Sequence, residues 1–443
     1  MHFSSLPHDI LRDIFMKTRT IRGSRTQIPT VIMLSQVAPF TRRIVYNEAL
    51  LWTEIDDQVL NNLAYLYLHL DLSRHCPLDI RFHPVLGDRT DGSYPLSNFM
   101  PLLVHSDRWR RLVIGSWSMR VLSATVNMLK YVRPQMLEEL IVMWDAEVLD
   151  PDSDEEDEDD ICIFFQCGAP CLKKLSLTGV RCIPSITRDL TDLQLTCNFH
   201  FDLPLWSYSD FVKIISKMIS LTNISMDWSV VRVGRRAITN PKTIALPNLQ
   251  SLVIVAHGGE VENCRYLAAM LALFSSAPLK SVDFYHDYSS GDDVRHIITH
   301  LRSGRIQFHQ ATTLVVELQS WTEDDVRRFI QVFPSVERLY FRWPTNGRSN
   351  ILDALINAPN TEDLCPRLHA IYLAHVGDPG PVFVLHQVRQ LAESRIASGN
   401  PFRELWIRQK SGMRSACEDI DWLHEHVQVQ WVSSDDLDGI FPL

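Results

Sequence analysis

The sequence predicts an α/β fold in which a short N-terminal helical segment precedes a solenoid of alternating strands and helices, with a parallel sheet on its concave side. Three observations predict it. The chain begins with an amphipathic helical pattern, MHFSSLPHDILRDIFMKT. A phrase of the form apolar-x-x-apolar-x-apolar recurs after residue 70. Amphipathic stretches with helical spacing separate the copies of this phrase.

The first stretch predicts a short helix with one apolar side. Ser5 is a candidate N-cap, and Pro7 suits the start of a helix, where a missing N–H costs nothing. The apolar residues fall on one stripe at 3.6 residues per turn: Ile10, Leu11, Ile14 and Phe15. So short a helix is marginal by itself and must pack against something. We therefore expect part of this apolar surface to await a partner.

The segments SLPHDILRDIF and LSQVAPFTRRIVYNEALLWTEI resemble the F-box, over residues 1–56. The matching positions are Leu6, Pro7, Ile10, Leu11, Val37, Phe40, Leu51 and Trp52. Asp9 replaces the family's usual Glu, and Ala38-Pro39-Phe40 replaces its usual Cys-x-x-Trp. The alternative is an ordinary helical cap on a larger domain.

The F-box resemblance implies a substrate-recognition subunit of a cullin–RING (SCF-type) ubiquitin ligase. Such a subunit binds a Skp-type adaptor on a cullin scaffold and holds a protein substrate elsewhere. The residues expected to face the adaptor are Leu6, Pro7, Ile10, Leu11, Ile14, Val37 and Trp52, with Ile14 and Trp52 as alternative candidates for the F-box core. The competing function is a non-catalytic repeat scaffold that assembles no ligase.

The recurring phrase extends over residues 70–430. Clear copies include CLKKLSLTG, NLQSLVIVAH, RLHAIYLAH and PFRELWIRQ, and ATTLVVELQS fits if Thr313 takes the first position. From Leu190 onward the copies begin 23–34 residues apart, enough for one strand and one helix per unit. The array resembles an irregular leucine-rich repeat, in the form common in fungal-type F-box families. A doubly wound α/β domain shows the same alternation and is the alternative.

The central variable position of each phrase should point to the concave face. Toward the C-terminus this row reads Asp283, Glu317, Tyr340, Tyr372 and Trp406, and the last three should form an aromatic ladder. Tyr, Trp and Arg are the residues enriched at interface hot spots. We therefore expect a protein substrate to bind at Asp283, Arg338, Tyr340, Arg342, Tyr372, Trp406 and Arg408. The simpler explanation is that aromatic residues suit any exposed strand.

One acidic run dominates the charge of the chain. The net charge is −10, and residues 147–160 carry ten acidic residues and no base. The rest of the chain is balanced, so a nucleic-acid partner is not expected. The run should form a disordered loop within the array. Ser153, followed by Asp-Glu-Glu, is a phosphorylation candidate, and a solubilising insertion is the alternative.

Composition and motifs indicate a recognition protein and no enzyme. No run of 18 apolar residues and no apolar signal region occurs, so we expect no membrane partner and a cytoplasmic or nuclear location. Nine scattered cysteines suit a reducing compartment. Cys162, Cys167, Cys171 and Cys182 lack the paired spacing of a zinc site. Catalytic and phosphate-binding motifs are absent, so we expect no cofactor and no metal.

Overall fold

The computed structural model divides the 443-residue chain into two compact units, residues 1–202 and 203–443. This boundary falls inside the array that the sequence predicts. The structure describes residues 6–19, 29–83, 96–116, 118–144, 162–184, 188–197, 206–233, 242–257, 261–287, 298–299, 301, 306–318, 321–343, 349–357, 364–375, 382–409 and 418–433.

The N-terminal helical segment comprises α1 (His8–Arg19), α2 (Thr30–Val37), α3 (Pro39–Asn47) and a 3₁₀ turn (Ala49–Trp52). The carbonyl of Pro7 accepts the first hydrogen bond of α1, from the amide of Leu11 at 3.1 Å. All four elements contribute to one small apolar core, formed by Leu11, Phe15, Val31, Ile32, Ile44, Val45, Leu51 and Trp52. The expected N-cap, Ser5, lies outside the described residues.

The main sheet of the first unit is parallel and follows the order of the chain. Its strands are β1 (Glu54–Ile55), β2 (Leu78–Phe82), β3 (Trp109–Ser116), β4 (Glu139–Trp144), β6 (Lys174–Thr178) and β8 (Asp192–Thr196). The helices between them are α4 (Asp57–Leu60), α5 (Leu63–Leu72), α6 (Leu96–Leu103) and α7 (Met119–Met128). A separate parallel pair joins β5 (Cys162–Phe164) to β7 (Cys182–Pro184).

The second unit repeats this arrangement. Its main strands are β10 (Asn223–Asp227), β12 (Ser251–His257), β13 (Ser281–Asp287), β14 (Thr313–Leu318), β15 (Arg338–Trp343), β16 (Ala370–His375), β17 (Glu404–Gln409) and β18 (Gln428–Ser433). Its described helices include α8 (Tyr208–Ile215), α10 (Val261–Leu273), α12 (Glu323–Ile330), α13 (Asn350–Ile356), α14 (Val382–Ala397) and α15 (Glu418–His426). A short pair, β9 (Trp206–Ser207) and β11 (Val231–Arg232), stands apart from the main sheet.

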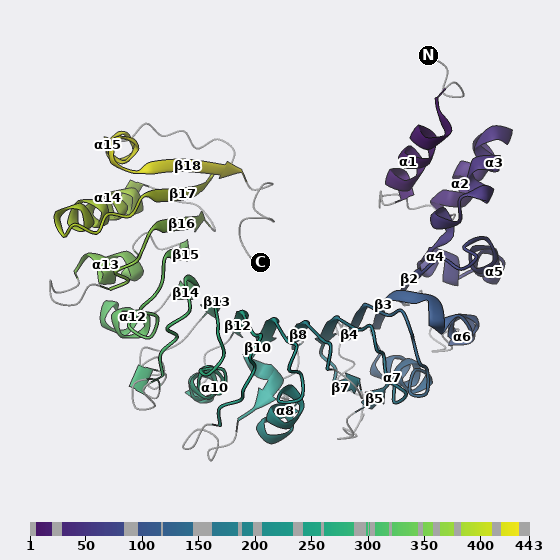
Figure 1. The fold of residues 1–443 in the computed structure, drawn as a ribbon, viewed down its shortest axis with the longest axis horizontal. Helices are drawn as coiled ribbons and strands as arrows, with labels where there is room; N and C mark the ends of the chain where they lie inside the picture. The colour runs from purple at the N-terminus through teal and green to yellow at the C-terminus, as the bar shows by residue number, and fades with distance from the viewer. Residues whose placement is uncertain are drawn as a thin grey trace. The chain divides into compact units, whose positions relative to one another are not determined.

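Within the second unit, α10 and α12–α15 lie on one side of the sheet (Figure 1). The recurring apolar phrase explains this layering. Its apolar positions fall at every second residue of each strand, so they lie on the same face of the sheet. On β15 and β16 these positions are Leu339, Phe341 and Ile371, all buried. The opposite face, called the open face below, carries the variable positions of the phrase.

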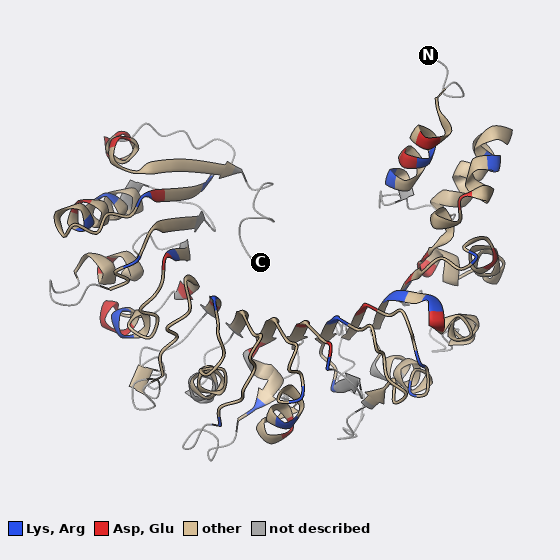
Figure 2. Cartoon of the chain, viewed as in Figure 1, with Lys and Arg blue, Asp and Glu red and all other residues tan. Residues whose placement is uncertain are grey.

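Side chains at the helix termini and on the helix surfaces support this layer. Thr322 and Ser349 cap α12 and α13, since their hydroxyls accept the amide hydrogens of Asp325 at 3.3 Å and Leu352 at 3.4 Å. Figure 2 shows both signs of charge on α12, where Arg327 pairs with Glu323 at 2.6 Å. The helices therefore present a polar outer surface and an apolar inner one.

The chain order of the strands differs from that of a doubly wound domain. In such a domain the order reverses at a switch point, and helices cover both faces. In each unit here, every strand of the main sheet pairs with the next along the chain. The protein is therefore an α/β protein with a large parallel sheet. Among the described residues, no helix is long and apolar enough to cross a membrane.

Candidate functional site

Two of the residues expected to face an adaptor are core residues instead. Leu11 is 2% exposed and Trp52 is fully buried. The indole N–H of Trp52 donates to the backbone carbonyl of Val45 at 2.8 Å, and its ring meets His69 edge-on at 5.0 Å. Leu11 and Trp52 therefore belong to the core of the helical segment, which for Trp52 agrees with the alternative interpretation of the sequence.

The other expected residues reach the surface to different degrees. Ile10 is 47% exposed, Val37 is 69% exposed, and Pro7 is exposed. Leu6 and Ile14 are half-buried and pack against the core of the helical segment. Ile10 and Ile14 have helical spacing that places them on one side of α1, and Pro7 directly precedes this helix. We call Leu6, Pro7, Ile10, Ile14 and Val37 the N-terminal apolar surface.

In the second unit, three aromatic side chains form a stack across neighbouring strands. Tyr340, Tyr372 and Trp406 are register partners on β15, β16 and β17. The rings of Tyr340 and Tyr372 are stacked with centroids 3.9 Å apart, and those of Tyr372 and Trp406 with centroids 5.5 Å apart. Equivalent phrase positions meet because parallel strands pair in register. We call these three residues the aromatic ladder.

The aromatic ladder is less exposed than the sequence suggests. Tyr340 and Tyr372 are buried in a cluster with Val315 and Ala370, and Trp406 is half-buried against it. Burial, followed by the hydrogen bond to Tyr372, raises the pKa of the Tyr340 hydroxyl. Because neighbouring rings cover one another, Trp406 is the ladder residue most available to a partner.

The carboxylate of Glu404 links Trp406, the accessible end of the aromatic ladder, to His369. The indole N–H of Trp406 donates to Glu404 at 3.1 Å, and the second oxygen of Glu404 lies 3.3 Å from Nε2 of His369. Glu404 thus fixes the orientation of the tryptophan ring, as a hydrogen-bonded neighbour does in a preformed site.

Asp283 is the most unusual side chain of the open face. It lies in the same row as the aromatic ladder, in register with Val253 on one side and Val315 on the other. It is fully buried, and Ser281 donates to its Oδ1 at 2.9 Å. Its Oδ2 has no hydrogen-bond partner among the described residues. Burial raises the pKa of Asp283 to about 7, and the hydrogen bond from Ser281 opposes this only in part.

The three arginines expected in the site differ in what the structure describes. Arg338 is exposed on β15 and Arg408 is half-buried on β17. The backbone of Arg342 pairs with Ala374 in register, and its side chain lies outside the described residues. The acidic run and Ser153 also lie outside them.

No family model matches this chain, and no curated protein matches it.

Glu317 does not occupy the ladder row. Asp283 and Tyr340 are both in register with Val315, so the phrase on β14 begins two residues earlier than expected. Glu317 stays on the same face because side chains alternate with a period of two, and it lies in register with Tyr285. With this earlier start, the copy on β14 lies 32 and 25 residues from the copies before and after it, in place of 34 and 23. The more even spacing could have revealed the correct register.

Sequence reasoning also missed Tyr285, which is half-buried and packs against the ladder cluster. It follows Asp283 by two residues and therefore shares its face, so the alternation of β13 was a usable signal. Among the described residues, no group of three or more His, Cys, Asp or Glu side chains could hold a metal ion. The chemistry on the open face is that of aromatic stacking, hydrogen bonding and buried carboxylates, among them Asp283 and Glu317.

Proposed function

We propose that this protein is a substrate-recognition subunit of a cullin–RING ubiquitin ligase. Its N-terminal helical segment is an F-box that docks on a Skp-type adaptor. Its strand–helix array is an irregular leucine-rich-repeat-like solenoid that holds a protein target. The protein supplies no catalytic residue, because tethering raises the concentration of target lysines near the charged ubiquitin carrier.

The observation that carries this proposal is the N-terminal apolar surface. Ile10 and Val37 stay exposed although the segment has its own core, completed by Trp52 and Leu51. Contiguous patches of exposed apolar side chains mark interaction sites, and we infer that these residues form such a patch. A helical cap that only closed the array would bury these side chains against its strands.

The array supports the second half of the proposal. Parallel strands in chain order leave one face of the sheet of the second unit free of the helices that the structure describes (Figure 1). Repeat proteins use such faces to bind other proteins. Trp406 lies half-exposed on this face, held by Glu404, and tryptophan is prominent among interface hot spots.

The alternative is a repeat scaffold that assembles no ligase. One observation favours it: Leu11 and Trp52 are core residues, so the surface left for an adaptor is smaller than the F-box resemblance implies. Adaptor binding separates the two functions.

The test measures binding of the full chain to purified Skp-type adaptor by isothermal titration calorimetry. We expect binding by the wild type and at least a tenfold loss in the double variant Ile10→Asp, Val37→Asp. Val104→Asp is the matched control, since Val104 directly follows α6, is 81% exposed and lies outside the N-terminal apolar surface. Wild-type protein that does not bind the adaptor would refute the ligase assignment and leave the scaffold. Equal losses in the control would refute the assigned surface.

A further inference from the structure

The buried carboxylate of Asp283 has an incomplete set of partners. Ser281 satisfies one oxygen, while the other has none among the described residues. Its register neighbours, Val253 and Val315, are apolar and cannot supply one. Buried polar groups are hydrogen-bonded in the great majority of cases, so an unpartnered buried oxygen calls for an explanation.

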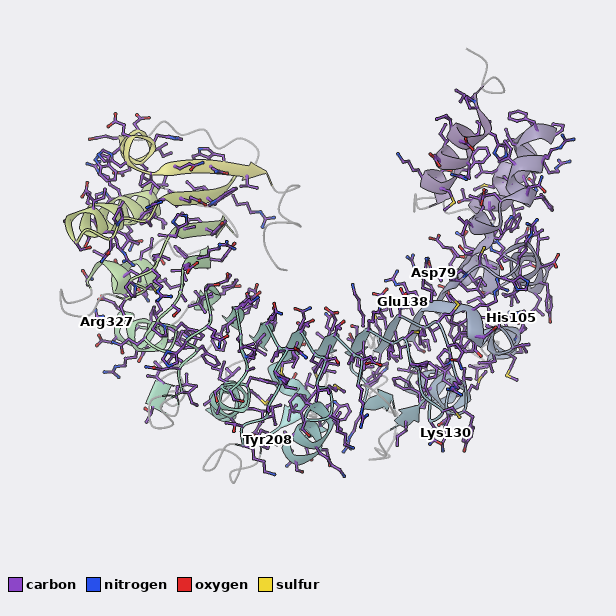
Figure 3. The ribbon with its side chains drawn as sticks, in the orientation of Figure 1. Asp79, His105, Lys130, Glu138, Tyr208 and Arg327 are labelled. Atoms are coloured by element: carbon purple, nitrogen blue, oxygen red, sulfur yellow. The ribbon has the colours of Figure 1, made fainter. Side chains whose placement is uncertain are left out.

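Two other acidic side chains on the strands form ion pairs. Asp79, at the start of β2 (Figure 3), accepts from Nε of Arg110 at 2.9 Å. Glu139 on β4 pairs with Arg111 of the neighbouring strand at 2.5 Å. Asp283 therefore differs from Asp79 and Glu139 in having an oxygen without a hydrogen-bond partner.

We propose that the open face of the second unit binds a lysine or arginine side chain of the partner protein, with its charge at Asp283 and its carbon stem against the aromatic ladder. This inference rests on the proposed function, because it specifies the chemistry of the captured target.

The row geometry suits such a side chain. Asp283 and Tyr340 lie two strands apart in one row, about 10 Å between their backbones, with Val315 between them. A lysine or arginine carries its charge at the end of a long apolar stem, so the two parts can contact a carboxylate and an aromatic wall at once. Aromatic faces also attract cations directly.

Other ligand classes match the row less well. An anionic group would be repelled by the ionised form of Asp283, and an apolar group would leave its Oδ2 unsatisfied. Arg338 lies two residues before the row residue Tyr340 on β15, but it is exposed, so water and salt screen its charge. With a pKa of about 7, Asp283 can be neutral when no cation is present and ionise when one arrives.

The test selects peptides from a display library of random linear dodecapeptides on immobilised full-length protein. We expect lysine and arginine to be enriched at one position in peptides selected by the wild type, and this enrichment to disappear with Asp283→Asn. Ser225→Asn is the matched control, since Ser225 occupies the same row on β10 and receives the same amide. This control should select the same peptides as the wild type.

A synthetic version of the best peptide gives the second measurement. Replacing its basic residue with norleucine, which keeps the stem and removes the charge, should weaken binding to the wild type at least tenfold and leave binding to Asp283→Asn unchanged. The wild-type comparison stands even if that variant folds poorly. Selection of no peptide, of peptides without basic enrichment, or of the same peptides by both proteins would overturn the inference.

The outcomes for the two proposals remain distinguishable. Selected peptides without a basic preference would refute the cation site and leave adaptor binding untouched. Failure of the wild-type protein to bind the adaptor would refute the ligase assignment whatever the peptides show.

Discussion

Replacing Asp283 with asparagine should stabilise the protein at neutral and alkaline pH. The folded carboxyl has a pKa of about 7, whereas the unfolded one has its ordinary value of 3.8. Between these values the folded state holds a proton that the unfolded state has lost. The wild type therefore loses stability as the pH rises from about 4 to about 7. Asparagine does not titrate in this range, and its side-chain oxygen can still accept from Ser281.

The magnitude follows from the difference between the two pKa values. At about 1.4 kcal/mol for each pH unit, the wild type loses about 4 kcal/mol relative to the variant by pH 8. The second unit has about 240 residues, and an unfolding entropy of about 2.1 cal/mol/K per residue converts this to roughly 8 °C in Tm. The advantage of the variant should vanish near pH 4.

The assay is thermal unfolding followed by circular dichroism at pH 4 to 8, on both full-length proteins. Asp79→Asn is the control, because it neutralises a carboxylate that is paired with Arg110 and should give no stabilisation. A Tm difference between Asp283→Asn and the wild type that stays constant from pH 4 to 8 would refute the reasoning. It would mean that Asp283 is ionised and satisfied in the folded protein.

Two further predictions concern packing in the first unit. Trp52→Phe should cost about 1–2 kcal/mol, because the carbonyl of Val45 loses the indole donor, and Trp52→Ala about 3–5 kcal/mol, both measured by urea unfolding. A neutral result would argue against the buried position of Trp52. Gly115→Ala should cost about 1–3 kcal/mol, since its Cβ would lie 2.1 Å from Cδ2 of His83. The same substitution in a His83→Ala background should cost clearly less, and equal costs in both backgrounds would exclude this clash.

The sequence predicted the ladder because its signal is local and repeated. The phrase fixes which residues of each strand face the helices, and equivalent positions meet when parallel strands pair in register. Tyr340, Tyr372 and Trp406 therefore lie side by side as predicted. The one error of register, at Glu317, arose because a shift of two residues preserves the alternation.

The sequence was less informative about exposure. Leu11 and Ile14 belong to the same apolar stripe of α1, yet the first is buried and the second is half-exposed. The stripe alone cannot show which part the neighbouring helices cover. The same limit applies to Tyr340 and Tyr372, whose rings bury each other.

The sequence by itself determined the α/β class, the alternation of strands and helices, and the faces on which side chains lie, because periodicity along the chain encodes all three. Tertiary structure alone decided which side chains another protein can reach and which carboxylate oxygen lacks a hydrogen-bond partner. Burial and hydrogen bonding depend on residues far apart in the chain, and no local pattern records them. Asp283 shows this most clearly: its position in the phrase was readable, but its unpartnered oxygen follows from the strands on either side.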